Sequence, residues 1–450
     1  MRDNNFITEN NAKHLWHPMG APGDSINNPP KVITKADGSQ ISDIDGHTTV
    51  DAVGGLWCVN LGYSNDAIKE AISEQLYHLP YYSGFAGTTN PAAIEASYMV
   101  TEMFKADGME RVFFTSGGSD SVETCLRLAR QYHRLRGEPT RTKFISLKKG
   151  YHGTHFGGAS VNGNNRFRIA YEPLLPGCFH LPSPYTYRNP FNETDPKKLA
   201  LNIVQAFEDE IAFQDKNTIA AFIMEPIQGA GGVIVPDASF MGLMQEVCDR
   251  NGILMISDEV ITGFGRTGSW SGARHWNVKP DMMSMAKGIT SGYFPVGAAL
   301  MSGKVASVFE NSANSDAGIF HGYTYSAHPV GAAAVCACLS ETQRISTKDN
   351  AGVRGKQLYE GIQRLKKKFD VIGDVRGGQG LMAAIEVVSD PNKKTPMDMD
   401  TMKKLHQKTY EAGAMVRLGL NNILMSPPLV ISEAEIDQIL YALDYGFSSI

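Results

Sequence analysis

The 450-residue sequence lacks the features that mark several other classes of protein. No apolar run approaches the roughly 20 residues that would span a bilayer, and the polar amino terminus has no apolar core of the kind found in secretory signals. No basic tract is longer than the three lysines at 366–368, and the formal net charge is −5, which argues against a nucleic-acid partner. We therefore expect a soluble, cytoplasmic protein without a membrane or nucleic-acid partner.

Cysteine is also scarce. The six cysteines form no CxxC pair and have no accompanying histidine cluster, so neither a disulfide framework nor a metal site is indicated. We expect reduced thiols at all six positions: Cys58, Cys125, Cys178, Cys248, Cys336 and Cys338.

The composition is that of an ordinary globular protein, with 42% hydrophobic and 20% charged residues, and the length favours two domains. Residues 1–62 are predicted to form an N-terminal arm and part of a small domain. Residues 63–327 are predicted to form a large domain, and residues 328–450 a C-terminal small α+β domain.

Within 63–327, helical patterns alternate with short apolar runs, which predicts βαβ units and a largely parallel sheet covered on both faces. The stretch 166–198, rich in proline and aromatic residues, is predicted to be an extended loop beside the site. Helices are expected at 65–76, 91–104, 119–136, 237–251, 329–339, 353–369, 397–412 and 432–447. Strands are expected at 31–34, 40–43, 111–115, 143–147, 219–224, 253–257, 282–286, 297–301, 371–376, 381–387, 415–418 and 422–425.

Lys287 directly follows the apolar run 282–286. A primary amine at such a position is desolvated, which disfavours the ammonium and leaves a nucleophile that forms an imine with an aldehyde. Asp258 follows the neighbouring apolar run, where its carboxylate could hold a pyridine nitrogen protonated. Together the two residues suggest pyridoxal phosphate (PLP) as cofactor. The structural alternatives are a snorkelling surface lysine and a helix-capping or surface aspartate.

A glycine-rich turn joins the strand 111–115 to the following helix. Gly117, Gly118 and Ser119 would let backbone amides approach an anion at the start of that helix, so the turn predicts a phosphate site. The turn lacks the P-loop lysine and does not match the dinucleotide fingerprint. Its structural alternative is a plain glycine turn with Ser119 as the helix cap.

Other candidate site residues also lie near strand ends. Tyr151 could stack on a flat cofactor ring, with His152 beside it, and Glu225 directly follows another apolar strand at the expected ligand face. The alternatives are an aromatic plug with a satisfied loop histidine, and a turn with a solvated glutamate. For Arg417 the ordinary alternative is an exposed salt bridge.

In their order, these motifs resemble those of the class III, fold-type I PLP aminotransferases, especially the branch that transfers amino groups from ω-amino acids or amines to pyruvate. The resemblance covers nearly the whole chain, from Gly54-Gly55-Leu56-Trp57-Cys58 to Ser426-Pro427-Pro428-Leu429. The series between them comprises Ser116-Gly117-Gly118-Ser119, Tyr151-His152-Gly153, Glu225-Pro226, the run 258–266, Ala286-Lys287-Gly288 and Gly322-Tyr323-Thr324-Tyr325.

The resemblance implies an α/β fold in which the large domain, a mostly parallel seven-stranded sheet covered by helices, binds PLP beside a smaller α+β domain. It makes Lys287 the Schiff-base lysine and proton shuttle, and Asp258 the partner of the pyridinium nitrogen. A homodimer with a shared active site is implied as well, and whether dimers pair into tetramers is left open. The further roles that it implies are phosphate binding by Gly117, Gly118, Ser119 and the other subunit's Thr324; ring contacts by Tyr151, His152, Glu225 and Val260; and substrate contacts by Trp57, Phe85, Ala230 and Arg417.

The chain departs from the family pattern in two places, the phosphate turn and Ala230. Many relatives have a serine between the glycines of the phosphate turn and a glutamate after it, where this chain has Gly118 and Asp120. Ala230 stands where 4-aminobutyrate aminotransferases would be expected to carry a glutamate that neutralises Arg417, the family's mobile arginine. The small residue favours pyruvate over 2-oxoglutarate as the amino acceptor.

The expected reaction is a ping-pong transamination from an ω-amino acid or primary amine to pyruvate, giving an aldehyde or ketone and alanine. Taurine, β-alanine, putrescine and longer amines all remain candidate donors. A PLP-dependent aminomutase or a dialkylglycine-type decarboxylase on the same scaffold is the alternative. An NAD(P)-dependent oxidoreductase is a distant one, because its glycine fingerprint is missing. A non-catalytic binding function is a poorer explanation, because it would not explain why these residues recur at strand ends.

Overall fold

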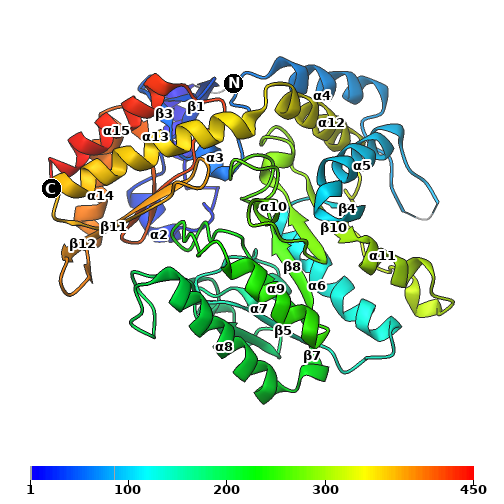
Figure 1. The fold of residues 1–450 in the computed structure, drawn as a ribbon. Helices are drawn as coiled ribbons and strands as arrows, with labels where there is room; N and C mark the ends of the chain where they lie inside the picture. Colours follow the sequence, from blue (N-terminus) through cyan, green and yellow to red (C-terminus); the bar gives the residue numbers. More distant parts are fainter. Residues whose placement is uncertain (1–2, 86) are drawn as a thin grey trace.

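The computed structural model describes residues 3–85 and 87–450. Its largest element is the predicted seven-stranded sheet, which runs through the middle of the molecule (Figure 1). Six of the seven strands point the same way, and β10 runs antiparallel to both of its neighbours. In spatial order the strands are β4 (Met109–Thr115), β10 (Gly297–Ser302), β9 (Met282–Met285), β8 (Leu254–Asp258), β7 (Ile219–Met224), β5 (Lys143–Leu147) and β6 (Cys178–Leu181).

Helices cover both faces of this sheet, as expected for strands that are apolar on both sides. Every residue of β7 is buried. Its side chains alternate between two hydrophobic clusters, with Phe222 and Met224 in one and Ala221 and Ile223 in the other. The helices that pack in the first cluster include α5 (Pro91–Phe104), α8 (Pro196–Gln214), α9 (Phe240–Asn251) and α12 (Pro329–Arg344). Three pack in the second: α6 (Gly118–Leu135), α7 (Phe156–Val161) and α11 (Gly303–Glu310).

A third cluster lies in the C-terminal part of the chain, where three helices pack on a five-stranded sheet. Figure 1 shows two of these helices, α13 in yellow and α15 in red, beside the N-terminal strands in blue. The helices are α13 (Thr347–Lys368), α14 (Met399–Glu411) and α15 (Glu433–Phe447). The strands are β11 (Ile372–Arg376), β12 (Ala383–Asp390), β13 (Thr395–Pro396), β15 (Arg417–Gly419) and β16 (Asn422–Met425).

The N-terminal and C-terminal segments share a four-stranded sheet. In this sheet β3 pairs in parallel with β14, so that Val50 lies opposite Ala414. Its strands are β1 (Ile33–Asp37), β2 (Gln40–Asp43), β3 (Thr48–Asp51) and β14 (Ala414–Met415). The remaining helices are α1 (Asn4–Asn10), α2 (Pro22–Asn27), α3 (Gly54–Trp57), α4 (Asp66–His78) and α10 (Gly272–His275).

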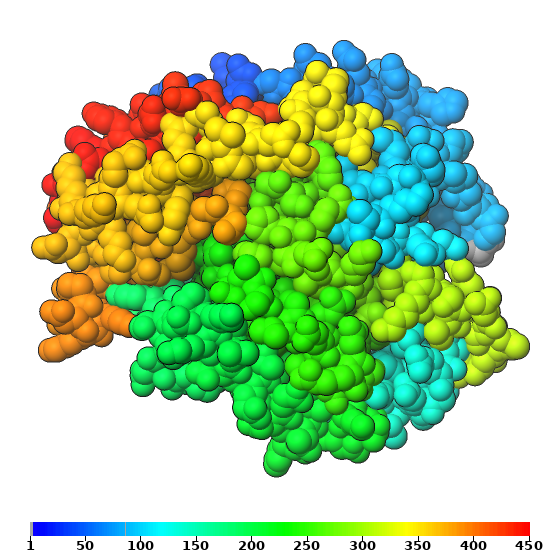
Figure 2. Space-filling view, in the orientation of Figure 1, coloured from blue at the N-terminus to red at the C-terminus, as the bar shows by residue number. Residues whose placement is uncertain are grey.

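The C-terminal part also contacts the middle of the chain, which Figure 2 shows as orange and yellow atoms against green. One contact is the bond from Arg376 Nε to the Gly232 carbonyl oxygen, at 2.6 Å. It ties β11 to the turn that follows β7. None of the helices in the described residues combines the length and the apolarity needed to cross a membrane.

The prediction for residues 166–198 was wrong in part. The stretch 166–198, expected to be an extended loop, contains β6, which pairs in parallel with β5 at the edge of the large sheet. Its last residues begin α8, which runs on to Gln214 and was not predicted. Arg166 and Phe167 lie in a short 3-10 helix.

Candidate active site

Lys287 and Asp258 lie on the same cavity. Asp258 is the last residue of β8, and Lys287 follows the neighbouring strand β9, which pairs in parallel with β8 through Asp258 and Ser284. The carboxyl ends of adjacent parallel strands meet at one edge of a sheet, where α/β proteins bind their ligands. The cavity has a volume of about 170 Å³, and its lining includes Leu56, Gly118, Ser119, Tyr151, His152, Glu225, Val260 and Ile261.

The Lys287 amine is desolvated, as the sequence predicts. Burial lowers the pKa of Lys287, and the negative charge of Asp258 opposes that shift by raising it. The backbone of Lys287 has a φ of 50°, in the left-handed region. The Lys287 side chain therefore loses its proton more readily than that of an exposed lysine. The alternative of a snorkelling surface lysine is wrong.

Asp258 is held by two neighbours. Its Oδ2 lies 2.8 Å from His152 Nδ1, and its Oδ1 accepts a hydrogen bond from the Val260 N–H at 3.2 Å. Asp258 is only 3% exposed and His152 only 1%. The other ring nitrogen, His152 Nε2, is buried and has no partner among the described residues. The alternatives of a surface aspartate and a satisfied loop histidine do not describe this pair.

Glu225 holds the loop that carries Tyr151. Its Oε1 accepts the Tyr151 N–H at 2.9 Å, and its Oε2 accepts the Gly229 N–H at 2.8 Å. The pKa of Glu225 is raised to about 7, mainly by burial; the charge of Asp258 adds to this rise, and His152 opposes it. Glu225 is 5% exposed, so the alternative of a solvated glutamate is wrong.

The glycine turn presents the start of α6 to the same cavity. Gly117, not Ser119, occupies the N-cap position, and no side chain caps the helix. Ser119 Oγ instead accepts a hydrogen bond from the Thr154 N–H at 3.2 Å. A Cβ atom on Gly118 would lie 3.0 Å from Val260 Cγ1, so the glycine allows close packing. The uncapped amides of an 18-residue helix suit a phosphate group.

Arg417, on β15, and Ala230 line a second cavity of about 290 Å³. Burial lowers the pKa of Arg417, which lies in the electrostatic field of Tyr151 and Arg166. No hydrogen bond or ion pair joins its guanidinium to any residue in 3–85 or 87–450. Arg417 is thus not the exposed salt bridge that was its ordinary alternative.

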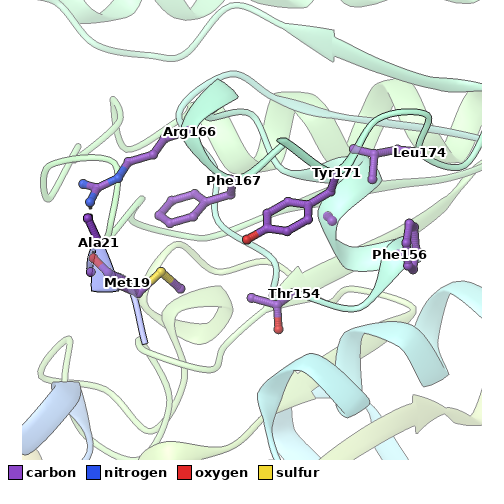
Figure 3. A pocket seen from close by; sticks show the side chains of 10 residues that line it. Met19, Ala21, Thr154, Phe156, Arg166, Phe167, Tyr171 and Leu174 are labelled. Atoms are coloured by element: carbon purple, nitrogen blue, oxygen red, sulfur yellow. Dashed lines mark hydrogen bonds between the residues drawn. The ribbon is translucent and has the colours of Figure 1, made fainter. Parts of the chain in front are cut away.

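A third cavity, of about 520 Å³, lies on the other side of Arg166 and Phe167, which line both it and the Arg417 cavity. Figure 3 shows Met19 and Ala21 from the N-terminal arm facing Arg166, with Phe167 and Tyr171 projecting into the cavity and Thr154 below them. The Phe167 ring lies 5.0 Å from the Tyr151 ring, which lines the Lys287 cavity, so the two cavities adjoin at this aromatic pair.

Three predicted site residues lie away from these cavities. Trp57 is 2% exposed and packs with Ile227 and Ile261, while its neighbour Leu56 faces the Lys287 cavity. Phe85 is 48% exposed and lines a surface cavity with Gly322. Thr324 is exposed nearby, and its carbonyl oxygen accepts a hydrogen bond from the Tyr81 hydroxyl at 2.8 Å. Their predicted roles require either movement or a second chain.

The site thus combines a desolvated amine, a held carboxylate, an aromatic ring and an anion-binding helix start. A family model described as aminotransferase class-III matches residues 23–445. The chain is a class III aminotransferase. A putrescine–pyruvate aminotransferase of Pseudomonas aeruginosa is 35% identical over 91% of this aminotransferase and 89% of that protein. A taurine–pyruvate aminotransferase of Bilophila wadsworthia is 33% identical over 97% and 96% of the two chains.

Solved structures agree with this assignment. The fold of this aminotransferase matches that of a PLP-bound amine transaminase from an uncultivated Pseudomonas species, with a TM-score of 0.95 and 44% identity over 97% and 99% of the two chains. An (S)-enantioselective omega-transaminase from Thermomicrobium roseum gives a TM-score of 0.94 and 35% identity over 99% and 98%. The fold is therefore fold-type I, the enzyme is PLP-dependent, and its reaction is amino transfer. Neither the mutase and decarboxylase alternatives nor the oxidoreductase is favoured.

The residues around the Lys287 cavity fit this cofactor. The Lys287 amine, whose pKa is lowered, suits reaction with the PLP aldehyde. Asp258, which His152 holds in place, suits the ring nitrogen, and the uncapped start of α6 suits the phosphate. The unpartnered Nε2 atom of His152 is a buried polar atom in the same cavity lining.

Some residues of the site were missed by the sequence analysis. Leu56, Ile261 and Ala286 line the Lys287 cavity, and each lies within a quoted motif without having been given a role. Asn162 hydrogen-bonds the His152 backbone N–H and the Gly153 carbonyl, which fixes the Tyr-His-Gly loop. A lone asparagine eleven residues after Tyr151 carries no signal in the sequence. Lys149, which lines the Arg417 cavity, was also not singled out.

Proposed function

We propose that the enzyme transfers the amino group of an ω-amino acid or primary amine to pyruvate, by a ping-pong mechanism that yields an aldehyde or ketone and alanine. The observation that carries the choice of acceptor is Arg417, which has no anionic partner in the described residues and shares its cavity with the small side chain of Ala230. An arginine left free in this way can pair with a substrate carboxylate in bidentate geometry.

The residues would divide the work as follows. Gly117, Gly118 and Ser119 would hold the phosphate through the start of α6, and Asp258, oriented by His152, would hold the ring nitrogen. Tyr151 and Val260 would contact opposite faces of the ring, with Glu225 fixing the Tyr151 backbone.

Bound PLP supplies an electron sink for negative charge on the donor carbon. Lys287 Nζ would take the proton from that carbon and deliver it to the carbon on the other side of the donor nitrogen, and its desolvation supports the base role. Because Lys287 lies on the same cavity as Asp258, the base stays close to the carbon that it deprotonates. The cavity walls Leu56 and Ile261 are apolar and help to exclude water.

Acceptor preference is tested with the purified holoenzyme. A panel of taurine, β-alanine and putrescine is assayed with pyruvate or 2-oxoglutarate, and alanine and glutamate are measured. We expect alanine to form with kcat/KM at least about tenfold higher than glutamate, a difference within the reach of one charged contact. Carbon dioxide release, or amino transfer within one molecule without a keto acid, would support the decarboxylase or the mutase instead.

Ala230→Glu places a carboxylate beside Arg417. It should pair with the guanidinium and lower kcat/KM for pyruvate relative to 2-oxoglutarate. Ala230→Gln is the matched control, because it has nearly the same size without the charge. An equal change in both variants would show that bulk, not charge, matters here, and would remove Arg417 from acceptor selection.

We further propose a homodimer with shared active sites, in which Phe85 and Thr324 of the partner subunit complete each Lys287 cavity. The support is that both residues are exposed and lie outside that cavity in their own chain. Two such dimers could also pair into a tetramer, and the molar mass from light scattering distinguishes a dimer from a tetramer.

Mixing tests the shared site. Lys287→Ala and Thr324→Asp chains, each poorly active, are unfolded and refolded together. If sites are shared, the mixed dimer contains one cavity with both native residues, and activity returns. If Thr324 serves its own chain, every site in the mixture remains defective and no activity returns.

We propose a cytoplasmic location as well, because all six cysteines are free thiols although several lie near the surface. Fractionation of the source cells with an antibody against this chain tests it, and recovery in a secreted or oxidising fraction would contradict it.

A further inference from the structure

The Arg417 cavity is rich in positive charge. Four cationic side chains line it, and a single carboxylate, that of Glu386, lines it with them. The cations are Lys149, Arg166, Arg188 and Arg417. Whether this charge is available to a ligand depends on which of the four already have partners.

Glu386 is fully engaged. Its Oε1 accepts a hydrogen bond from Arg188 Nε at 2.6 Å, and its Oε2 lies 3.5 Å from Arg376 Nη1 and accepts a hydrogen bond from the Tyr185 hydroxyl. The carboxylate is only 2% exposed. It therefore compensates Arg188 and Arg376 and has no remaining capacity for Lys149 or Arg417.

Arg166 is directed elsewhere. Its Nη2 lies 3.5 Å from the Met19 carbonyl oxygen, at the limit of a hydrogen bond. Figure 3 shows its guanidinium beside Met19 and Ala21, at the edge of the neighbouring cavity. Arg166 therefore lines the Arg417 cavity, but its guanidinium is directed toward the neighbouring one.

Lys149 is the second cation without a partner. Within 3–85 and 87–450 its ammonium makes no hydrogen bond or ion pair, and it lies over the Tyr185 ring, whose centroid is 5.4 Å away. Burial lowers the pKa of Lys149, Glu386 opposes this, and Arg376 and Arg188 add to it. An ammonium without a counterion in such a place is unfavourable unless a ligand supplies the charge.

The backbone fixes Lys149 in this position. The φ of Lys149 is 67°, and its N–H donates to the Gly163 carbonyl oxygen at 2.8 Å. A Cβ on Gly231 would collide with the Lys149 carbonyl oxygen. A residue held in the left-handed region by its surroundings is typical of a functional position. Lys149 is also two residues before Tyr151, so the cation and the ring contact share one loop.

The cavity lies next to the reaction centre. Phe167 lines it, and the Phe167 ring lies 5.0 Å from that of Tyr151, which lines the Lys287 cavity. The charge of Arg417 acts on Lys287 itself, whose pKa it lowers. This cavity is therefore the charged space beside Lys287 that is available to the far end of a donor.

We propose that Lys149 and Arg417 together form a subsite for the acidic end of the amino donor, and that the preferred donors carry a doubly charged tetrahedral group such as a phosphonate. Two unpaired cations are neutralised by a dianion, whereas one carboxylate leaves a charge uncompensated in a half-buried cavity. Lys149 is then a specificity-determining residue. This inference rests on the proposed transamination and names the donor class for it.

The test compares donors that differ only in their acidic end. The holoenzyme is assayed with 2-aminoethylphosphonate, taurine, β-alanine and the uncharged n-butylamine, with pyruvate as acceptor. In Lys149→Met, the ratio of kcat/KM for the phosphonate to that for butylamine should fall by about tenfold or more, with a smaller fall for β-alanine. Lys149→Arg keeps the charge and should keep most of the preference.

Lys148→Met is the matched control, since Lys148 is exposed, adjoins Lys149 and does not line the cavity. It should leave every ratio unchanged. The proposal is overturned if Lys149→Met lowers all donors equally, if it leaves the ratios as they are, or if the wild-type enzyme uses the phosphonate no better than β-alanine.

Binding gives a readout that does not depend on turnover. Ethylphosphonate has the acidic end without the amine, and calorimetry measures its affinity for the holoenzyme. Lys149→Met should weaken binding at least about fivefold, and Lys149→Arg should restore it. If no donor yields alanine, the proposed function fails while this measurement still decides the subsite. If alanine forms but ethylphosphonate binds both proteins equally, only the subsite fails.

Discussion

His152 Nδ1 lies 2.8 Å from Asp258 Oδ2, and the two residues are separated by 106 positions in the sequence. Both side chains are buried, so their relative position is fixed by the packing of the loop after β5 against the end of β8. A carboxylate that faces a cofactor ring must keep its orientation through every turnover, and a buried imidazole hydrogen bond provides that constraint.

This pairing makes a graded prediction. Asp258→Asn keeps the size of the side chain but removes its charge, and kcat should fall about a hundredfold or more. His152→Ala should lower kcat less, by about tenfold, because the charge stays while its orientation is lost. His152→Asn should recover part of that loss, since its amide can donate from the Nδ1 position. Steady-state kcat and the PLP absorbance spectrum measure these effects; equal losses in both histidine variants would contradict the orienting role.

Lys287→Ala should eliminate turnover, lowering kcat by about a thousandfold or more because base and nucleophile are lost together. Borohydride treatment followed by peptide mass spectrometry should attach the cofactor to the peptide containing residue 287 in the wild type. The variant should show no such adduct while its circular dichroism is unchanged. A cofactor adduct on another lysine would refute the assignment.

The glycine turn offers a matched pair of substitutions. Gly118→Ala places a Cβ 3.0 and 3.1 Å from the two Val260 methyl carbons, whereas a Cβ on Gly117 meets nothing within 4 Å. Gly118→Ala should therefore cost about 1–3 kcal/mol of folding free energy and weaken PLP binding more than Gly117→Ala does. Denaturant unfolding and PLP titration of the two apoenzymes test this order. The reverse order would show that the Gly118 contact is unimportant.

Glu225 gives a prediction for the pH dependence of stability. Its pKa is raised from 4.5 to about 7 by burial, so between these values the folded apoenzyme holds a proton that the unfolded chain has lost. Its contribution to the free energy of unfolding therefore decreases as pH rises from 4.5 to 7. Glu225→Gln, neutral throughout, should be less stable overall because it keeps one acceptor oxygen for two N–H groups. Its stability should also fall less between pH 5 and pH 8. Identical slopes in urea unfolding of the two proteins would contradict the raised pKa.

Much of the large sheet was predictable because its strands are continuous apolar runs bounded by turn formers. The strands at Lys143–Leu147 and Ile219–Met224 have the predicted ends, as does Asn422–Met425 in the C-terminal part. Such runs are long enough to be recognised without knowledge of their partners. The strand Cys178–Leu181 was missed because it is only four residues long and lies in a proline-rich stretch. Its pairing with β5, which the sequence does not show, makes it a strand of the sheet.

The sequence predicted which residues form the site, but not how they contact one another. The sequence places Lys287, Asp258 and Tyr151 near strand ends, and the parallel sheet brings those ends together. It does not show that His152 orients Asp258, since that contact depends on tertiary packing. Nor does it show that Gly55, with φ 65° and ψ −93°, turns the chain so that Leu56 faces the cavity and Trp57 is buried. Local propensity cannot predict such a reversal.

The parallel pairing of β3 with β14 has a consequence for biosynthesis. Val50 leaves the ribosome more than 360 residues before Ala414, the residue opposite it in the sheet. Until that late segment emerges, the second edge of β3 is open, and its backbone groups are available to other nascent chains. The second edge of β3 therefore stays unpaired for nearly the whole of translation.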